Sequence, residues 1–218
     1  MEERAKRYID ELMERYPALN GCRESIMMAF DLLAASFREG KKLLVAGNGG
    51  SAADAEHLVG ELMKGFELPR SLPPELKEKL RAVNPELGNL LAEKLQQGLP
   101  AIALDGHVAL TTATLNDQGP EVAFAQQVMG YGQAGDVFLG ISTSGKSRNV
   151  LLAATAARAI GLRVIGLTGE ADSPLAALCD VCIRVPASGS YRVQELHLPV
   201  YHCLCLMLEE TFFGGENA

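Results

Sequence analysis

This sequence of 218 residues lacks an apolar run long enough to span a lipid bilayer, and it lacks an excess of basic residues. It has 20 Lys and Arg against 27 Asp and Glu, which gives a formal net charge of -7. Such a chain is poorly matched to nucleic acid or to an anionic membrane surface, so we expect neither as its main partner. Any phosphate group has to be bound locally, by backbone amides and helix N-termini.

An export signal and a disulfide framework are also missing. The N-terminal stretch MEERAKRYIDELMERY is charged and amphipathic without an apolar signal core, so we expect a cytoplasmic protein. The five cysteines are an odd number and their spacing is irregular. Cys179 and Cys182 form a C-x-x-C, but the segment CDVCIRV predicts an apolar strand with buried thiols rather than a redox pair.

What is present indicates one globular α/β domain over residues 1–218. Hydrophobic residues make up 48% of the chain and charged residues 22%. Apolar runs typical of strands recur between helical patterns, near residues 42–47, 100–105, 136–141, 163–169 and 181–185. This alternation predicts a five-stranded parallel sheet between two layers of helices, a three-layer αβα sandwich with an additional N-terminal helix.

Helix signals flank the predicted strands. We expect a helix over residues 21–39, capped by Asn20 and ended by Gly40, and a final helix over residues 193–212. Residues 67–99 break the alternation, with apolar residues at helical spacing in PELKEKLRAV and PELGNLLAEKLQQ. We interpret them as a helical insertion, whose apolar stripe packs either on its own body or on a neighbouring subunit.

A glycine loop follows the first predicted strand. GNGGSA, at residues 47–52, fits the pattern G-x-G-x-x-A between a strand and a helix, as in dinucleotide-binding proteins. Those proteins also have an acidic residue about twenty positions further on, whereas Asp105 comes much later. The more general interpretation is a tight turn whose amides, with Ser51, face an anion or a hydroxyl.

A serine loop follows the third predicted strand. GISTSGKS, at residues 140–147, matches the Walker A pattern of nucleotide-binding proteins. That pattern usually opens its domain, whereas here it lies past the middle of the chain. The alternative is a nest of hydroxyls for a phosphate monoester at a helix N-terminus, formed by Ser142, Thr143, Ser144 and Ser147.

Asn116 and Asp117 lie in the segment TLNDQGPEVAF. They form a turn that ends a helix, or they bind substrate hydroxyls at the carboxyl end of the unit that follows the second predicted strand. The residues leave both interpretations open.

Histidine is scarce, with four residues, and two of them have notable neighbours. His57 and Glu61 share one face of the helix that the glycine loop opens, because they are four residues apart. The segment VQELHLPVYH supplies Gln194 and His202, about 12 Å apart along a helix. Two His, one Glu and one Gln suit zinc if the side chains lean together. Otherwise His57 and Glu61 are a surface pair and His202 a core residue, or His202 acts on substrate, or the ligands come from two subunits.

Together, the motifs GNGGSAADAEH, LND, GDVFLGISTSGKS, VIGLTG and VQELHLPVYH resemble the sugar isomerase (SIS) family, and within it the phosphoheptose isomerases. The resemblance covers most of residues 20–212 outside the insertion. It implies the SIS fold and conversion of sedoheptulose 7-phosphate to D-glycero-D-manno-heptose 7-phosphate, for ADP-heptose and lipopolysaccharide-type biosynthesis. It also implies a homotetramer with active sites at subunit interfaces.

The resemblance carries residue roles. It implies a zinc ion on His57, Glu61, Gln194 and His202, and proton transfer through an enediol by Glu61 and His202. It implies substrate contacts at three segments and on the last helix, from Asn48, Gly49, Gly50, Asn116, Asp117, Ser142, Thr143, Ser144, Ser147 and Gln194.

Two residues depart from the family pattern: Lys146 stands where Asn is usual, and Tyr191 where an acidic residue is usual. An alternative is a non-catalytic SIS regulator that binds a phosphosugar or a protein such as the replication initiator DnaA. The presence of both Glu61 and His202 favours the enzyme. A nucleotide-binding protein of the P-loop type is the less favoured alternative.

Overall fold

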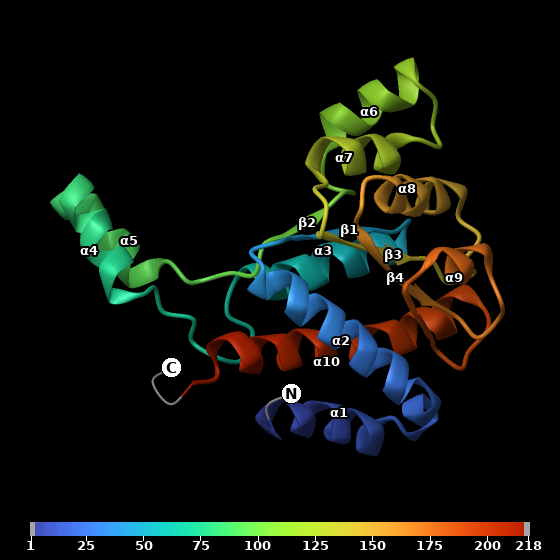
Figure 1. The fold of residues 1–218 in the computed structure, drawn as a ribbon, viewed down its shortest axis with the longest axis horizontal. Coiled ribbons are helices and arrows are strands. Elements are labelled where there is room, and N and C mark those ends of the chain that lie inside the picture. The colour runs from blue at the N-terminus through green and yellow to red at the C-terminus, as the bar shows by residue number, and fades with distance from the viewer. Residues whose placement is uncertain (1–2, 216–218) are drawn as a thin grey trace.

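A computed structural model describes residues 3–215 and contains one parallel sheet. Its strands lie in the order β2-β1-β3-β4-β5, and every neighbouring pair is parallel (Figure 1). The strands are β1 (Leu43–Ala46), β2 (Ala101–Ala103), β3 (Val137–Ile141), β4 (Arg163–Thr168) and β5 (Val181–Arg184). All five predicted strands are confirmed to within a few residues.

Helices cover both faces of this sheet, which confirms the three-layer αβα prediction. One face packs on α2 (Arg23–Arg38), α3 (Gly50–Met63) and α10 (Ser190–Phe213). The other packs on α7 (Ala123–Tyr131), α8 (Arg148–Ala159) and α9 (Pro174–Leu178). The helix α1 (Glu3–Arg15) and the 3-10 helix η1 (Pro17–Cys22) lie outside the first layer, where α1 packs along α10 (Figure 1).

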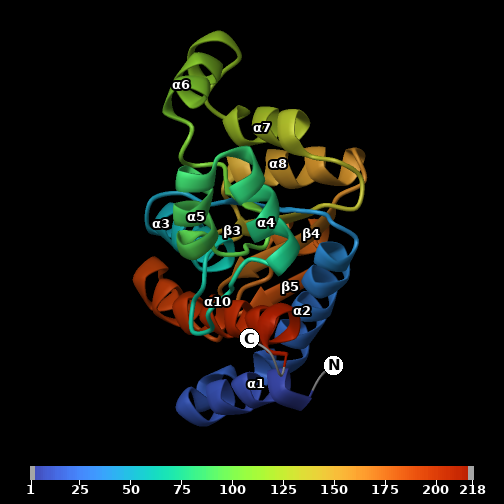
Figure 2. The same cartoon turned by 90° about the vertical axis from the view of Figure 1, so that its left-hand side faces the viewer.

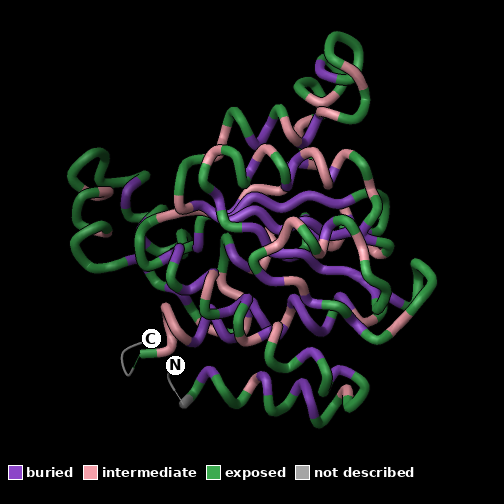
Figure 3. Tube along the Cα trace, turned by 45° about the vertical axis from the view of Figure 1, so that its right-hand side comes forward, coloured by how far each residue is buried: buried purple, intermediate pink, exposed green. Residues whose placement is uncertain are grey.

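The three central strands, β1, β3 and β4, are buried on both sides (Figure 3). Leu43 and Val45 of β1 join the core on the α3 and α10 side, whereas Leu44 joins the core on the α8 side. Successive side chains of a strand point to opposite faces, and here both faces are apolar. This is why the strands read as continuous hydrophobic runs.

The predicted N-cap of α2 was wrong, whereas its predicted end was right. Asn20 lies inside η1, and α2 begins only at Arg23 without a side-chain cap. Gly40 has φ +71°, a left-handed conformation that glycine adopts without strain, and it ends the helix as expected.

The insertion forms a helical hairpin of α4 (Pro74–Val83) and α5 (Pro85–Lys94), as predicted. It projects from one end of the molecule (Figures 1 and 2), and a single bridge between Ser71 and Gln96 closes its base. Its apolar stripe does not pack on the body of the chain, since Val83 is 88% exposed and Leu87 is 58% exposed.

The C-x-x-C segment differs from the predicted strand of buried thiols. Only Cys182 lies in β5, whereas Cys179 follows the end of α9, and both side chains are half-buried. Cys203 and Cys205 are buried in α10, as expected. Within residues 3–215, no helix is both long and apolar enough to cross a bilayer.

Candidate active site

The order of the strands creates a topological switch point at the carboxyl ends of β1 and β3. The helices that follow these adjacent strands, α3 and α8, cover opposite faces of the sheet, so their preceding loops diverge. Such a switch point is where open α/β sheets bind ligands. The glycine loop follows β1 and the serine loop follows β3, so both predicted loops flank this switch point.

Two asparagines tie the loops together. Nδ2 of Asn48 donates to Oδ1 of Asn149 at 3.0 Å, and Nδ2 of Asn149 donates to Oδ1 of Asn48 at 2.8 Å. The glycine loop therefore lies directly against the first turn of α8.

The glycines of the first loop allow close approach. Gly49 has φ +58°, and a Cβ on Gly50 would lie 2.6 Å from Nε2 of Gln194. Gly50 begins α3, so Gln194 of α10 lies against the first turn of that helix. Ser51 is only 3% exposed and its amide donates to the Asn48 carbonyl, which places it under the loop rather than on its open side.

The serine loop gathers hydroxyls between two helix N-termini. The Oγ atoms of Ser142 and Ser147 are 2.9 Å apart, and Ser147 immediately precedes α8. Oγ1 of Thr143 lies 3.4 Å from Oγ of Ser190, the first residue of α10. Beside the loop is a cavity of about 160 Å³, lined by Thr143, Ser144 and Lys146 on one side. Helix N-termini and hydroxyls suit an anion.

Further along α3, the predicted acid–base residues lie together. Nε2 of His57 is 3.2 Å from Oε1 of Glu61, and the rings of His57 and His202 are 4.9 Å apart, edge to face. Nε2 of His202 is buried and has no hydrogen-bond partner among the described residues. Burial, followed by the neighbouring His57, lowers the pKa of His202.

Behind this group is a pair that the sequence interpretation missed. The Tyr201 hydroxyl lies 3.3 Å from Oδ1 of Asp54 and 3.0 Å from Nδ1 of His57. Burial raises the pKa of both Tyr201 and Asp54. Asp54 lies one turn before His57, and Tyr201 is adjacent to His202, so helical spacing could have indicated both.

This chain of contacts bears on metal binding. A tyrosine hydroxyl has one proton, and when it donates to Asp54 its oxygen accepts from Nδ1–H of His57. Nε2 of His57 then carries a lone pair that faces the Glu61 carboxylate. Two lone-pair atoms at 3.2 Å require a proton or a cation between them. Nε2 of His57 and Oε1 of Glu61 therefore suit a divalent ion as ligands.

Gln194 stands apart from the other expected ligands. It contacts Gly50, and His57 follows Gly50 by seven residues, about 10 Å along α3. In residues 3–215, no three His, Cys, Asp or Glu side chains are already grouped as a metal site. The structure thus places His57 beside Glu61 and beside the ring of His202 without forming a complete metal site, and it leaves Gln194 beside the glycine loop.

A buried ion pair fixes the end of α3. Arg70 donates to Oε1 of Glu209 at 2.7 Å, and to the carbonyls of Glu61 and Leu62 at 2.9 and 2.6 Å. Glu209 also accepts from three amides of the following loop, Phe66, Glu67 and Leu68. Burial alone raises the pKa of Glu209, but these amides and Arg70 together hold it below its usual value.

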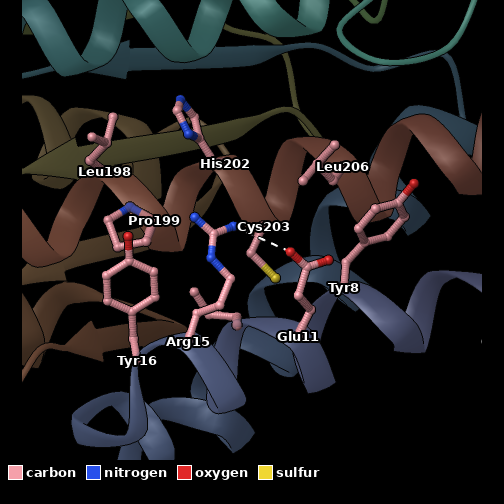
Figure 4. Close-up of a pocket in the computed structure, with 10 residues that line it drawn as sticks. Tyr8, Glu11, Arg15, Tyr16, Leu198, Pro199, His202, Cys203 and Leu206 are labelled. Atoms are coloured by element: carbon pink, nitrogen blue, oxygen red, sulfur yellow. Dashed lines mark hydrogen bonds and ion pairs between the residues drawn. The ribbon is translucent and has the colours of Figure 1, made fainter.

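His202 also lines a cavity of about 190 Å³ between α1 and α10. Figure 4 shows Arg15, the last residue of α1, and the following Tyr16 on one side of it, opposite Pro199 and Cys203 of α10. Arg15 of α1 and His202 therefore line the same cavity.

Asn116 and Asp117 lie at the end of α6 (Val108–Asp117), which stands away from the sheet (Figures 1 and 2). Nδ2 of Asn116 donates to Oδ1 of Asp117 at 2.8 Å. The helix leaves Val108 73% exposed. In this chain the pair ends a helix.

Comparison with known proteins gives a consistent result. A family model described as the SIS domain matches residues 7–84 and 80–169. A phosphoheptose isomerase of Rhodospirillum rubrum is 37% identical over 97% of this chain and 98% of that protein. One of Geotalea daltonii is 42% identical over 88% of this chain and 86% of that protein.

Solved structures agree in fold. A phosphoheptose isomerase of Francisella tularensis superposes with a TM-score of 0.74 and 30% identity, covering 95% of this chain and 97% of that chain. One of Neisseria gonorrhoeae gives a TM-score of 0.69 and 31% identity, covering 95% of this chain and 92% of that chain.

Proposed function

The chain belongs to the SIS-domain family and, within it, to the phosphoheptose isomerases, and from this we propose that it converts sedoheptulose 7-phosphate to D-glycero-D-manno-heptose 7-phosphate in heptose biosynthesis. One observation carries the proposal. The serine loop adjoins the start of α10, and the His57–Glu61–His202 group lies two to three turns further along the seam between α3 and α10.

This arrangement separates binding from chemistry. The helices α3 and α10 run in the same direction, because Gly50 meets Gln194 and His57 meets Tyr201. An extended sugar phosphate with its phosphate at the serine loop directs its other end along this seam. The hydroxyls of Ser142, Thr143, Ser144 and Ser147 bind the phosphate, and Asn48, Gly49 and Gly50 line the sugar's path.

Isomerisation moves a proton between C1 and C2 through an enediol. Glu61 and His202 are the proton-transfer groups: one removes the proton from carbon and the other moves a proton at the neighbouring oxygen. The hydrogen bonds from Asp54 through Tyr201 to His57 fix the ring of His57. Arg70 fixes the backbone of Glu61, so the carboxylate is held in position.

A zinc ion on His57, Glu61, Gln194 and His202 would polarise the carbonyl and hydroxyl oxygens of the substrate. The unpaired Nε2 of His202 and the facing acceptors of His57 and Glu61 support it. Gln194 has to reach toward the other three for all four to bind one ion.

The resemblance further supports a cytoplasmic homotetramer with active sites at subunit interfaces. The exposed apolar residues of α6 and of the α4–α5 hairpin agree with further subunit contacts. Light scattering of the purified protein tests the tetramer, and a monomer that is fully active would contradict it.

The enzymatic test is a coupled assay of the purified chain on a panel of ketose phosphates of different length. The panel is run after chelator treatment and again after zinc is restored. The seven-carbon substrate should be turned over without nucleotide, and zinc should restore the rate. Turnover of none of the panel would overturn the proposal in favour of a non-catalytic regulator. Binding of Mg-ATP that is lost on Lys146→Ala would favour the nucleotide-binding alternative.

A further inference from the structure

The two thiols of the C-x-x-C lie side by side against β4. Gly166 of β4 pairs in register with Cys182 of β5. A Cβ on Gly166 would lie 2.7 Å from Sγ of Cys179 and 3.1 Å from Sγ of Cys182. Both sulfur atoms therefore occupy the space that the missing side chain leaves, although Cys179 comes from the end of α9.

Cys182 differs from the other cysteines, because it is the thiol whose pKa is lowered. The proximity of the two sulfur atoms lowers the pKa of Cys182 to about 7 and raises that of Cys179. Oγ1 of Thr168 at 3.6 Å and the charge of Arg184 add to the lowering. For Cys22, Cys203 and Cys205, in contrast, burial raises the pKa. A thiolate is the reactive form of cysteine, so Cys182 is the expected nucleophile.

Cys182 is also accessible. A cavity of about 400 Å³ opens beside β5, and Cys182, Arg184, Glu170 and Cys22 are among its lining residues. A small molecule in this cavity therefore lies against Cys182, whereas Cys179 is not among the lining residues.

We propose that Cys179 and Cys182 are a reversible redox pair, oxidised to a disulfide by low-molecular-weight disulfides of the glutathione type. The Cys182 thiolate attacks one sulfur of the small disulfide, forms a mixed disulfide and releases one small thiolate. The thiol of Cys179 then loses its proton and attacks Sγ of Cys182, and the second small thiolate leaves. Two protein thiols are oxidised, and one small disulfide is reduced to two thiols.

Oxidation is linked to the serine loop through α9. The Cys179 thiol donates to the Leu175 carbonyl at 3.1 Å, and the Leu175 amide donates to the Gly145 carbonyl of the serine loop at 3.1 Å. A disulfide requires the sulfurs to approach to about 2.05 Å and leaves no proton for this hydrogen bond. We expect oxidation to raise the KM for the sugar phosphate about threefold, and to leave kcat within about twofold. This kinetic part rests on the proposed function, whereas the disulfide itself does not.

The chemical test is thiol mapping of the full-length protein by mass spectrometry after incubation in glutathione redox buffers. The peptide that contains Cys179 and Cys182 should lose two hydrogens and resist alkylation, and dithiothreitol should reverse both changes. Cys179→Ser should stop at a glutathione adduct on Cys182, and Cys182→Ser should leave Cys179 reduced. Cys22→Ser is the matched control, because Cys22 lines the same cavity, and it should oxidise as the parent does.

Full alkylation of both thiols in the oxidising buffer would overturn the proposal, and so would a bond from Cys182 to Cys22. Sugar phosphate kinetics of the oxidised and reduced protein then test the link. A KM that does not change on oxidation would overturn the connection through α9, while an inactive reduced protein would count against the proposed function instead.

Discussion

The serine loop, which suits an anion, and the seam between α3 and α10, which holds the acid–base residues, are built in different ways. The serine loop gathers four hydroxyls from six consecutive residues, Ser142 to Ser147, at the start of a helix. The seam assembles Asp54, His57 and Glu61 with Tyr201 and His202, which are at least 140 residues away along the chain. Binding an anion needs only local backbone geometry, whereas acid–base chemistry needs side chains buried and oriented by distant partners.

The largest expected effect comes from substitutions that remove the acid–base residues between α3 and α10 and leave the serine loop intact. Glu61→Gln and His202→Ala should each lower kcat by about 10²- to 10⁴-fold, since each removes a proton-transfer group. Both variants should keep their melting temperature and their affinity for a phosphate-bearing inhibitor, measured by calorimetry. Near-normal turnover by either variant would show that the seam does not carry the chemistry.

The next largest effect is expected from the buried ion pair between Arg70 and Glu209, which holds the end of α3 in place. Arg70→Ala leaves the buried carboxylate of Glu209 without its cation, which should cost about 3–5 kcal/mol of unfolding free energy in urea titrations. Arg148→Ala is the matched control, because its ion pair with Glu121 beside the serine loop is exposed and should contribute less than about 1 kcal/mol. Equal losses in the two variants would contradict this contrast.

A third prediction concerns His197, which lies on α10 between the two regions. It is fully buried, and burial lowers its pKa from 6.5 to about 4. Because the unfolded chain takes up a proton first, stability should fall as pH decreases from 6.5 toward 4, by up to about 3 kcal/mol. Urea unfolding at several pH values should show a weaker dependence for His197→Leu. An unchanged pH dependence would mean that His197 is not the group responsible.

The smallest effect tests the serine loop. Ser147→Ala removes the partner of Ser142 and one hydroxyl for the phosphate, and should raise KM about tenfold while kcat stays nearly constant. Thr155→Ala is the control, because its hydroxyl lies on the same helix but donates to the Leu151 carbonyl. If kcat fell as much as KM rose, binding and chemistry would not be separated as proposed.

Sequence patterns predicted the elements well wherever the cause was local. The five strands follow from apolar runs, the end of α2 from Gly40, and the α4–α5 hairpin from apolar spacing between prolines. The failures have equally physical causes. Asn20 was expected to cap a helix, but the chain continues through a 3-10 turn before α2 begins.

Within the site, the sequence predicted that His57 and Glu61 share a face, and that two loops rich in glycine and hydroxyls follow strands. It did not predict the roles of Tyr201, Asp54, Arg70 and Glu209, because tyrosine, aspartate and ion pairs are common in any chain. Their importance depends on burial and on partners far away in sequence. Gln194 and the Asn116–Asp117 pair remain predictions as ligands of metal and substrate.

The sequence by itself determined the order of the elements, the loops that suit an anion, and the family to which the chain belongs. These depend on hydrophobic periodicity, glycine conformations and helix N-termini, which act over a few residues. Only the tertiary structure decided which side chains meet along α3 and α10, and that the two thiols of the C-x-x-C share the space beside Gly166. Such contacts depend on the packing of segments remote in sequence, and a burial environment exists only once the core has formed.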